Sequence, residues 1–156
     1  MRGWLAIAAS VVVLDQGSKW EIVRQLAAGQ RVRLTGWLNL VLGYNRGAAF
    51  GFLSHAAGWQ NLLFSAIAVA MTVFIVVTLW RLPRNQAPLG WALALVLGGA
   101  IGNLLDRVRL GHVVDFIDFH IGHWHWYTFN VADSAISIGA VLLALDALGL
   151  FRRPGA

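Results

Sequence analysis

The sequence predicts an all-α membrane protein in which four transmembrane helices carry a small β-sheet at one membrane face. Of its 156 residues, 58% are hydrophobic and only 12% are charged, about half the charged fraction of an ordinary soluble domain. The apolar residues form four long segments. The connections between them contain stretches in which apolar and polar residues alternate, as in half-buried strands. Intrinsic disorder is excluded, because disordered chains are poor in apolar residues.

The four apolar segments cover about residues 4–23, 59–80, 88–105 and 131–150. A bilayer core requires roughly 20 mostly apolar residues of helix, and segment 59–80 meets this requirement without a charged residue. The first segment is the least clear, because Asp15 interrupts it. Its beginning, with Arg2 and an apolar run, also resembles a cleavable signal peptide. Three further apolar segments downstream favour an uncleaved span.

Four spans place both chain ends on one side of the membrane and residues 21–58 and 106–130 on the other. Five of the twelve Lys and Arg residues fall on the terminal side and seven on the opposite side, so the positive-inside rule leaves the orientation open. The sequence contains no repeats or long linkers, which predicts a single domain over residues 1–156. Its net charge of +5 forms no basic stripe, so we expect no nucleic-acid partner.

Alternation of apolar and polar residues marks three short stretches, 31–35, 37–42 and 123–127. All three lie on the side opposite the termini. We expect them to form a small sheet on the membrane surface, with its apolar face toward lipid or the helix ends.

Acidic residues are scarce and unevenly placed. Of the seven in the chain, six lie on the same side as the predicted sheet, and Asp146 lies on the other. The six are Asp15, Glu21, Asp106, Asp115, Asp118 and Asp133. Ionisable residues gathered at the rim of a membrane helix bundle indicate a functional site.

Two carboxylates can hydrolyse a peptide bond when they share one proton, one acting as general base on water and the other as acid. Asp115 and Asp133 are the candidates, since both lie in otherwise apolar local sequence that favours a perturbed pKa. Asp118 follows three residues after Asp115, and we expect it to be solvated and not catalytic. This chemistry needs no metal or cofactor. The chain has no cysteine, which excludes thiol nucleophiles and thiolate metal sites.

Some of these residues also have purely structural interpretations. Asn130 and Asp133 can form a capping box at the start of the fourth segment, and local sequence favours this as much as catalysis. Asp15 and Lys19 have the spacing of a surface ion pair on a helix. Gly98 and Gly102 have the spacing of a helix-packing motif.

Further site chemistry is less well supported. The histidines at 120, 123 and 125 fit no zinc-ligand pattern, and we expect one strand face to carry the last two with no acid fixed beside them. Asn103 can form hydrogen bonds across helices, and Arg107 can extend toward the membrane surface. Ser134 lacks the sequence context of a serine nucleophile.

Two other functions use the same residues. A small proton- or ion-coupled transporter can employ buried carboxylates, although the sequence lacks the inverted repeats and interrupted helices common in transporters. A non-catalytic membrane assembly factor would use the acids only as helix caps.

Five motifs occur in the order found in lipoprotein signal peptidase, also called signal peptidase II, and the chain resembles this family over essentially its whole length. The motifs are Asp15-Gln-Gly-Ser-Lys19, Asn45-Arg-Gly-Ala-Ala-Phe-Gly51, Gly98-Gly-Ala-Ile-Gly-Asn-Leu-Leu-Asp-Arg107, Val113-Val-Asp-Phe116 and Phe129-Asn-Val-Ala-Asp133.

The resemblance implies an aspartyl endopeptidase of the bacterial cytoplasmic (inner) membrane. Such an enzyme is multi-pass, with cytoplasmic termini, an extracytoplasmic β-sheet cradle and an active site near the outer, periplasmic leaflet. It removes the signal peptide from prolipoproteins by cutting on the N-terminal side of a diacylglyceryl-modified cysteine. By motif position, Asp115 and Asp133 would be the catalytic pair. The residues that would line or support the site are Asp15, Asn45, Gly99, Asn103, Arg107 and Asn130. We expect lipid-modified prolipoprotein and membrane lipid as partners, and a monomer.

Overall fold

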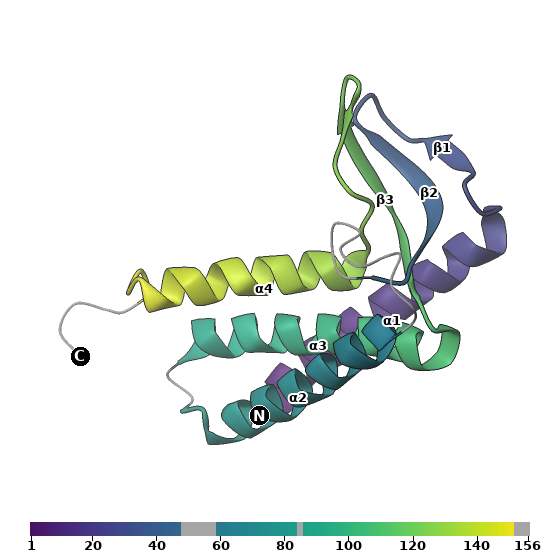
Figure 1. Cartoon of the computed structure of the whole chain (residues 1–156). Helices are drawn as coiled ribbons and strands as arrows, with labels where there is room; N and C mark the ends of the chain where they lie inside the picture. The colour runs from purple at the N-terminus through teal and green to yellow at the C-terminus, as the bar shows by residue number, and fades with distance from the viewer. Residues whose placement is uncertain (48–58, 84–85, 152–156) are drawn as a thin grey trace.

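The computed structural model describes residues 1–47, 59–83 and 86–151. Within these ranges the chain forms four helices and four strands. In chain order they are α1 (Arg2–Gln25), β1 (Arg31–Arg33), β2 (Leu38–Asn45), α2 (Trp59–Arg81), α3 (Ala87–Leu110), β3 (Val113–Ile121), β4 (Trp124–His125) and α4 (Val131–Ala147). Figure 1 shows the helices packed side by side, with the sheet rising from one end of them. The prediction of a mostly helical fold with a small antiparallel sheet is therefore confirmed.

Helix α3 occupies the centre and contacts α1, α2 and α4. Small residues make its close packing possible. A Cβ atom added to Gly98 would lie 2.6 Å from Cβ of Val11 and 2.7 Å from the carbonyl oxygen of Ala8, both on α1. The helix-packing interpretation of Gly98 is thus confirmed. The apolar core nearby joins Ala8, Ile75, Leu79, Leu93 and Leu97.

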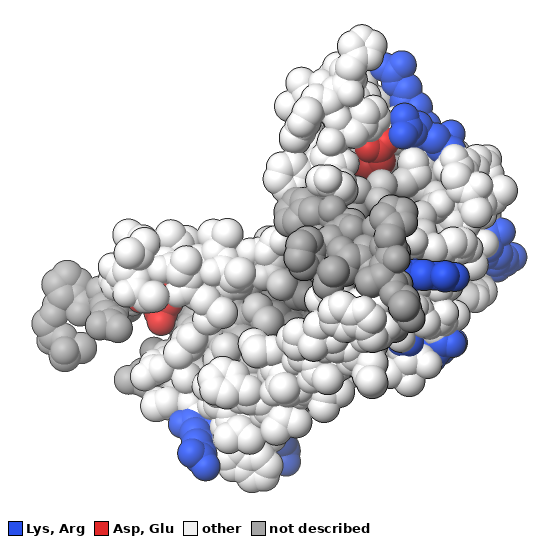
Figure 2. All heavy atoms as spheres, viewed as in Figure 1, with Lys and Arg blue, Asp and Glu red and all other residues white. Residues whose placement is uncertain are grey.

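Among the described helices, α2 and α3 are long and apolar enough to cross a membrane. Helix α2 exposes large apolar side chains along its length, including Leu62, Phe74 and Trp80, which is unfavourable in water. Figure 2 shows few charged residues on the visible face of the helices, most of the Lys and Arg lying near the sheet or at the far helix ends. The apolar surface suits a bilayer environment.

Two helix boundaries differ from the prediction. Helix α3 continues to Leu110, beyond the expected end at residue 105, because Asp106 turns inward to partners and so does not terminate the helix. Gly111, with φ of 75°, then caps it in the left-handed conformation that glycine adopts most readily. Helix α4 ends at Ala147, short of the expected residue 150.

The described strands form one antiparallel sheet in the order β1-β2-β3-β4. Strand β2 matches the expected stretch at 37–42 and continues to Asn45, and β1 matches the first half of 31–35. Only residues 124 and 125 of the expected stretch 123–127 are paired. Strand β3, the partner of both β2 and β4, was not predicted. Most of its side chains are buried on both faces, so the sequence shows no alternation there.

Candidate active site

Asp115 lies on β3 beside the end of β2, where the pairing register places Asn45 opposite Val113. The side-chain amide of Asn45 donates to Oδ2 of Asp115 at 3.0 Å. The backbone N–H of Gly47 donates to Oδ1 of Asn45 at 2.9 Å, which fixes the amide with its NH₂ group toward Asp115. The other part of this motif, residues 48–51, lies outside the described residues.

Asp133 lies in the first turn of α4, where Asn130 is the N-cap residue. The backbone N–H of Asp133 donates to Oδ1 of Asn130 at 2.9 Å, and the backbone N–H of Asn130 donates to Oδ2 of Asp133 at 3.3 Å. The capping box considered as a structural interpretation is therefore present. The capping box is compatible with a role in the site, since it fixes the orientation of the Asp133 side chain at the N-terminus of α4.

Two asparagine amides, of Asn103 and Asn130, connect the two aspartates. Asn130, which is fully buried, donates from Nδ2 to Oδ1 of Asp115 at 2.8 Å. Asn103 on α3 donates from Nδ2 to Oδ1 of Asp133 at 2.8 Å. The two amides also contact each other, at 3.2 Å from Nδ2 of Asn130 to Oδ1 of Asn103. Asp115 and Asp133 thus belong to one continuous hydrogen-bond network.

Both aspartates line a cavity of about 450 Å³ between β3, α3 and α4. Among the predicted site residues, Asn45, Asn103 and Arg107 line it too. The rest of its wall was not predicted from the sequence and consists of Val113, Trp126, Tyr127, Thr128, Phe129, Ser134, Ile136, Ser137 and Ile138. The position of residues 126–129 directly before Asn130 is the signal that could have indicated them.

The two carboxyl groups influence each other. Burial first, and then the charge of Asp133, raise the pKa of Asp115 from 3.8 to about 7, against the opposing effect of hydrogen bonds from Asn45 and Asn130. Asp115 itself is 2% exposed. A carboxyl group of this kind holds a proton near neutral pH and can exchange it there.

Arg107 contacts backbone carbonyl groups at the edge of the cavity. Its Nη2 lies 3.4 Å from the carbonyl oxygen of Gly47, and its Nη1 lies 3.5 Å from that of Asn103. Its guanidinium carbon lies 5.6 Å from the ring centre of Phe64 on α2. Arg107 therefore joins α3 to α2 and to the segment after β2.

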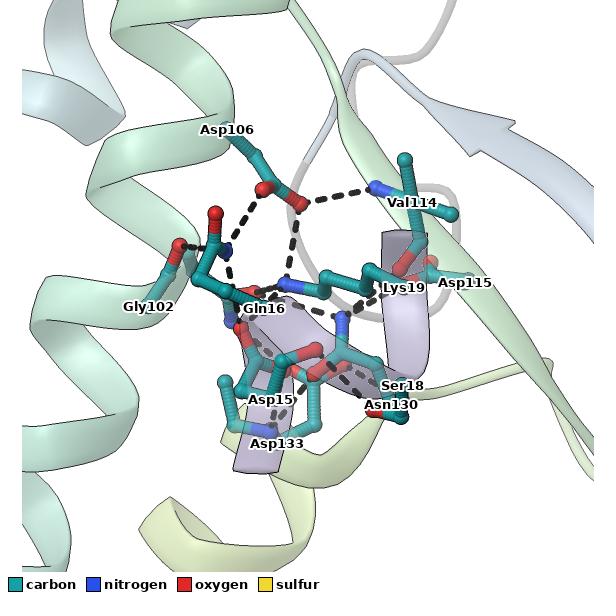
Figure 3. A network of polar contacts seen from close by, with 12 residues as sticks. Asp15, Gln16, Ser18, Lys19, Gly102, Asp106, Val114, Asp115, Asn130 and Asp133 are labelled. Carbon is teal, nitrogen blue, oxygen red and sulfur yellow. Dashed lines mark hydrogen bonds and ion pairs between the residues drawn. The ribbon is translucent and has the colours of Figure 1, made fainter. Parts of the chain in front are cut away.

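Behind the two aspartates lies a buried charge cluster of Asp15, Lys19 and Asp106 (Figure 3). Nζ of Lys19 lies 2.8 Å from Oδ2 of Asp15 and 2.9 Å from Oδ2 of Asp106. Asp15 and Lys19 were expected to form a surface ion pair, but they are 0% and 3% exposed, because α3 and the start of α4 cover this face of α1. Lys19 and Asp106 were not predicted as site residues, although both lie within the motifs.

Close backbone approach brings α3 against the start of α4. A Cβ atom at Gly99 would lie 2.4 Å from the carbonyl oxygen of Ala132, and one at Gly102 would lie 2.6 Å from Oδ2 of Asp15. Gly99 does not line the cavity. It permits the distance at which Asn103 reaches Asp133.

Asp118 belongs to a separate cluster within the sheet. Its carboxylate accepts from Nδ2 of Asn39 at 2.8 Å, and it lies 2.7 Å from Nδ1 of His125 and 3.5 Å from Nε of Arg31. The expectation that Asp118 is solvated is wrong, because these groups enclose it. The expectation that no acid lies beside His125 is wrong for the same reason, and His123 lies in the turn before β4. Glu21 bonds only with Gln25 among the contacts of the described chain.

Metal binding and a serine nucleophile are the other site chemistries that the sequence raised. Within the described ranges, no group of three or more His, Cys, Asp or Glu side chains is arranged to hold a metal ion. The hydroxyl of Ser134 donates to the carbonyl oxygen of Asn130 at 2.9 Å, an ordinary contact in a first helical turn.

The chain is similar to known peptidases over nearly its whole length. Residues 7–149 match the family model described as signal peptidase (SPase) II. A lipoprotein signal peptidase from Janthinobacterium sp. (strain Marseille) is 51% identical over 148 residues, which cover 95% of this chain and 89% of the relative. One from Burkholderia multivorans (strain ATCC 17616 / 249) is 53% identical over 145 residues, covering 93% and 87%.

Solved structures show the same fold. One described as a bacterial membrane enzyme superimposes with a TM-score of 0.88 at 30% identity, covering 100% of this chain and 94% of the other. A second structure with that description gives a TM-score of 0.83 at 32% identity, covering 95% and 94%.

Proposed function

The chain belongs to the signal peptidase II family, and from that premise we propose that Asp115 and Asp133 are its catalytic pair. The protein is an aspartyl peptidase that cleaves signal peptides from prolipoproteins, as its family does. Family membership sets aside the transporter and assembly-factor alternatives. The observation that supports the catalytic pair is that both carboxyl groups line one cavity and are joined through Asn103 and Asn130.

In this proposal the pair shares one proton, which Asp115 holds, while ionised Asp133 activates water. The water oxygen attacks the scissile carbonyl carbon as its proton passes to Asp133, and Asp115 protonates the carbonyl oxygen. When the tetrahedral intermediate collapses, Asp133 gives its proton to the leaving nitrogen. The C–N bond then breaks, and Asp115 recovers a proton from the intermediate. No step requires a metal or a cofactor.

The supporting residues have separate proposed tasks. Asn45 and Asn130 orient the Asp115 carboxyl group through their amide donors, and Asn103 orients Asp133. Arg107 holds the segment after β2 at the cavity edge. Asp15 accepts the backbone N–H of Ala132 at 2.9 Å, and Gly99 allows α3 and α4 to approach.

The substrate is proposed to be a diacylglyceryl-modified prolipoprotein, cut on the N-terminal side of the modified cysteine. Aromatic and aliphatic residues, among them Trp126, Phe129, Ile136 and Ile138, form much of the cavity wall around the carboxyl groups. Such a wall suits an apolar signal helix and acyl chains. Membrane lipid is the natural second partner, and nothing in the charge distribution favours nucleic acid.

We further propose that all four helices cross the bacterial inner membrane and that residues 1–156 act as a single integral-membrane peptidase domain. The ends of α1 and α3 and the starts of α2 and α4 then share the outer, periplasmic side with the sheet, and both termini are cytoplasmic. Helix α1 is retained in this arrangement, because it contributes Asp15 and Lys19 to the buried cluster. A monomer holds both proposed catalytic residues.

Purified protein in detergent, mixed with a diacylglyceryl-modified precursor, tests the proposal directly. We expect the wild type to release the signal peptide and to leave the unmodified precursor uncut. Asp115→Asn and Asp133→Asn should each lower the cleavage rate by at least about 10³-fold while the protein remains folded and inserted. Substantial cleavage by either folded variant would refute the catalytic pair.

A further inference from the structure

We propose that Lys19 is a positioning residue for the cleavage reaction, whose ammonium group ties together the two backbone segments that carry Asp115 and Asp133. The inference rests on the proposed function of that pair. It assigns a task to a buried charge that contacts neither catalytic carboxyl group in the described network.

Each of the two carboxylates bound by Lys19 accepts the backbone N–H of the residue that precedes one aspartate of the pair. Asp15 accepts through Oδ1 the backbone N–H of Ala132 at 2.9 Å, one residue before Asp133. Asp106 accepts through Oδ2 the backbone N–H of Val114 at 3.1 Å, one residue before Asp115. Nζ of Lys19 lies between them, at 2.8 and 2.9 Å (Figure 3). One ammonium group therefore joins the start of α4 to strand β3.

A third bond from Lys19 determines how Asn103 is oriented. Nζ of Lys19 donates to Oδ1 of Asn103 at 3.0 Å, and the NH₂ group of Asn103 donates to Oδ1 of Asp133 at 2.8 Å. An ammonium group has only donors. If the amide were reversed, its NH₂ would face the ammonium and its oxygen would face the carboxylate, so Lys19 excludes that orientation.

Stability alone is a poor explanation for this cluster. Lys19 and Asp15 are 3% and 0% exposed, and desolvating buried ion pairs offsets most of their attraction, so they contribute little net stability. Lys19 also does not line the cavity that holds the catalytic pair. It lines a separate cavity of about 220 Å³, together with Asp106 and Val114 among others. Lys19 therefore acts on the pair through its bonded partners Asp15, Asp106 and Asn103 and through its charge.

The charges around Asp115 give a measurable consequence. Asp115 is faced by Asp133 on α4, by the amides of Asn45 and Asn130, and by the positive charges of Lys19 on α1 and Arg107 on α3. Lys19 acts to lower the pKa of Asp115. Removing its charge should therefore move the alkaline limb of the activity profile to higher pH, whereas a simple loss of folded protein would leave the profile in place.

Lys19→Met is the principal variant, and Arg24→Met is its matched control. Both remove one positive charge from α1, but Arg24 is exposed and stacks on Trp20. Steady-state cleavage of a diacylglyceryl-modified precursor would be measured across pH in detergent, with the folded fraction determined by thermal melting. We expect Lys19→Met to lower kcat by about 100-fold, with KM within about twofold because the cavity wall is intact. Arg24→Met should match the wild type.

Asp106→Asn provides a second variant in case Lys19→Met does not fold, since it keeps an oxygen for Val114 but weakens the attraction to Lys19. It should lower kcat by at least about tenfold at unchanged KM. Folded Lys19→Met with kcat within twofold of the wild type would overturn the proposal. If only Asp106→Asn folds, a kcat of that variant within twofold of the wild type would overturn the proposal. Asp115→Asn is assayed in parallel. If Asp115→Asn is active, the proposed catalytic pair is refuted. If Asp115→Asn is inactive and Lys19→Met is fully active, only the positioning role of Lys19 is refuted.

Discussion

Asp115 and Asp118 lie three residues apart on β3, and each is 2% exposed, yet their proton affinities shift in opposite directions. The pKa of Asp115 rises to about 7. Burial also acts to raise the pKa of Asp118, but hydrogen bonds from His125 and Asn39 outweigh it and hold that pKa below its usual range.

The difference comes from the groups on the two faces of the strand. Asp115 faces the site, where its nearest charged neighbour is another carboxylate and its hydrogen-bond donors are neutral amides. Asp118 faces the sheet cluster, where His125 and Arg31 are its neighbours. Equal burial therefore accompanies a raised pKa at Asp115 and a lowered pKa at Asp118, because the neighbouring groups differ.

The largest expected effect separates the two aspartates by function. Asp115→Asn should lower precursor cleavage by at least about 10³-fold, while Asp118→Asn should leave it within about twofold because Asp118 contacts neither residue of the proposed catalytic pair. Thermal melting at pH 8 should show the reverse. Asp118→Asn loses charge-assisted bonds and should lower the free energy of unfolding by about 1–3 kcal/mol. Asp115→Asn should not be destabilised. Loss of cleavage in folded Asp118→Asn would contradict the assignment.

A smaller effect should show that the site depends on helix packing. Gly99→Ala places a Cβ atom 2.4 Å from the carbonyl oxygen of Ala132, so α4 must move away and separate Asp133 from Asn103. A shift of about 1 Å costs roughly 100-fold in rate, and overpacking costs about 1–3 kcal/mol of stability. Gly17→Ala on α1, where nothing lies within 4 Å of the added atom, is the control. It should keep full activity and melt slightly higher. Equal activity of the two variants would exclude the packing requirement.

The remaining expected effect is on pH dependence, and it is smallest near neutral pH. Because the pKa of Asp115 is about 7, the cleavage rate should fall about tenfold per pH unit in the alkaline range, as the shared proton is lost. A rate that stays level through pH 9 would rule out Asp115 as the proton donor.

Stability should respond to pH with opposite sign at the two aspartates. Folding raises the pKa of Asp115 above 3.8, so its contribution is complete below about pH 4 and is lost as pH rises through about 7. Folding lowers the pKa of Asp118, so its contribution is present above about pH 4 and is lost as pH falls below that value. Melting temperatures of the two Asn variants, compared with the wild type from about pH 2 to pH 8, measure both trends. If the stability differences of the two variants changed with pH in the same direction, the opposite pKa shifts of Asp115 and Asp118 would be contradicted.

The sequence predicted the positions of the helices well, because a long apolar run bounded by charged residues is compatible with few structures other than a helix. It did not predict β3, since Asp115 and Asp118 interrupt the pattern and both strand faces are covered. The end of α3 was misplaced for a related reason. Asp106 and Arg107 look like a terminus in sequence, whereas in space their partners lie on α1 and on the segment after β2.

The candidate site was predicted in part. Local sequence left Asp133 equally suited to a helix cap and to catalysis, and the structure places it in the capping box and on the cavity wall together. The pairing of Asp15 with Lys19 followed from their spacing. Its burial did not, because the covering residues come from α3 and α4, and spacing along one helix carries no information about them. The hydrogen bond that Asp106 accepts from the backbone N–H of Val114 could not be predicted for the same reason.

Asn130 starts helix α4 through its backbone and side chain, and the same side chain reaches Asp115. In the proposed function, folding and catalysis therefore depend on the same residue, so few substitutions of Asn130 should be tolerated. A small molecule that takes its polar contacts from Asp115, Asn130 and Asp133 would bind groups whose replacement is expected, in the proposed function, to remove either the reaction or the cap of α4. Mutational escape from such an inhibitor would have to arise in the apolar wall of the cavity, where substitutions leave this shared residue untouched.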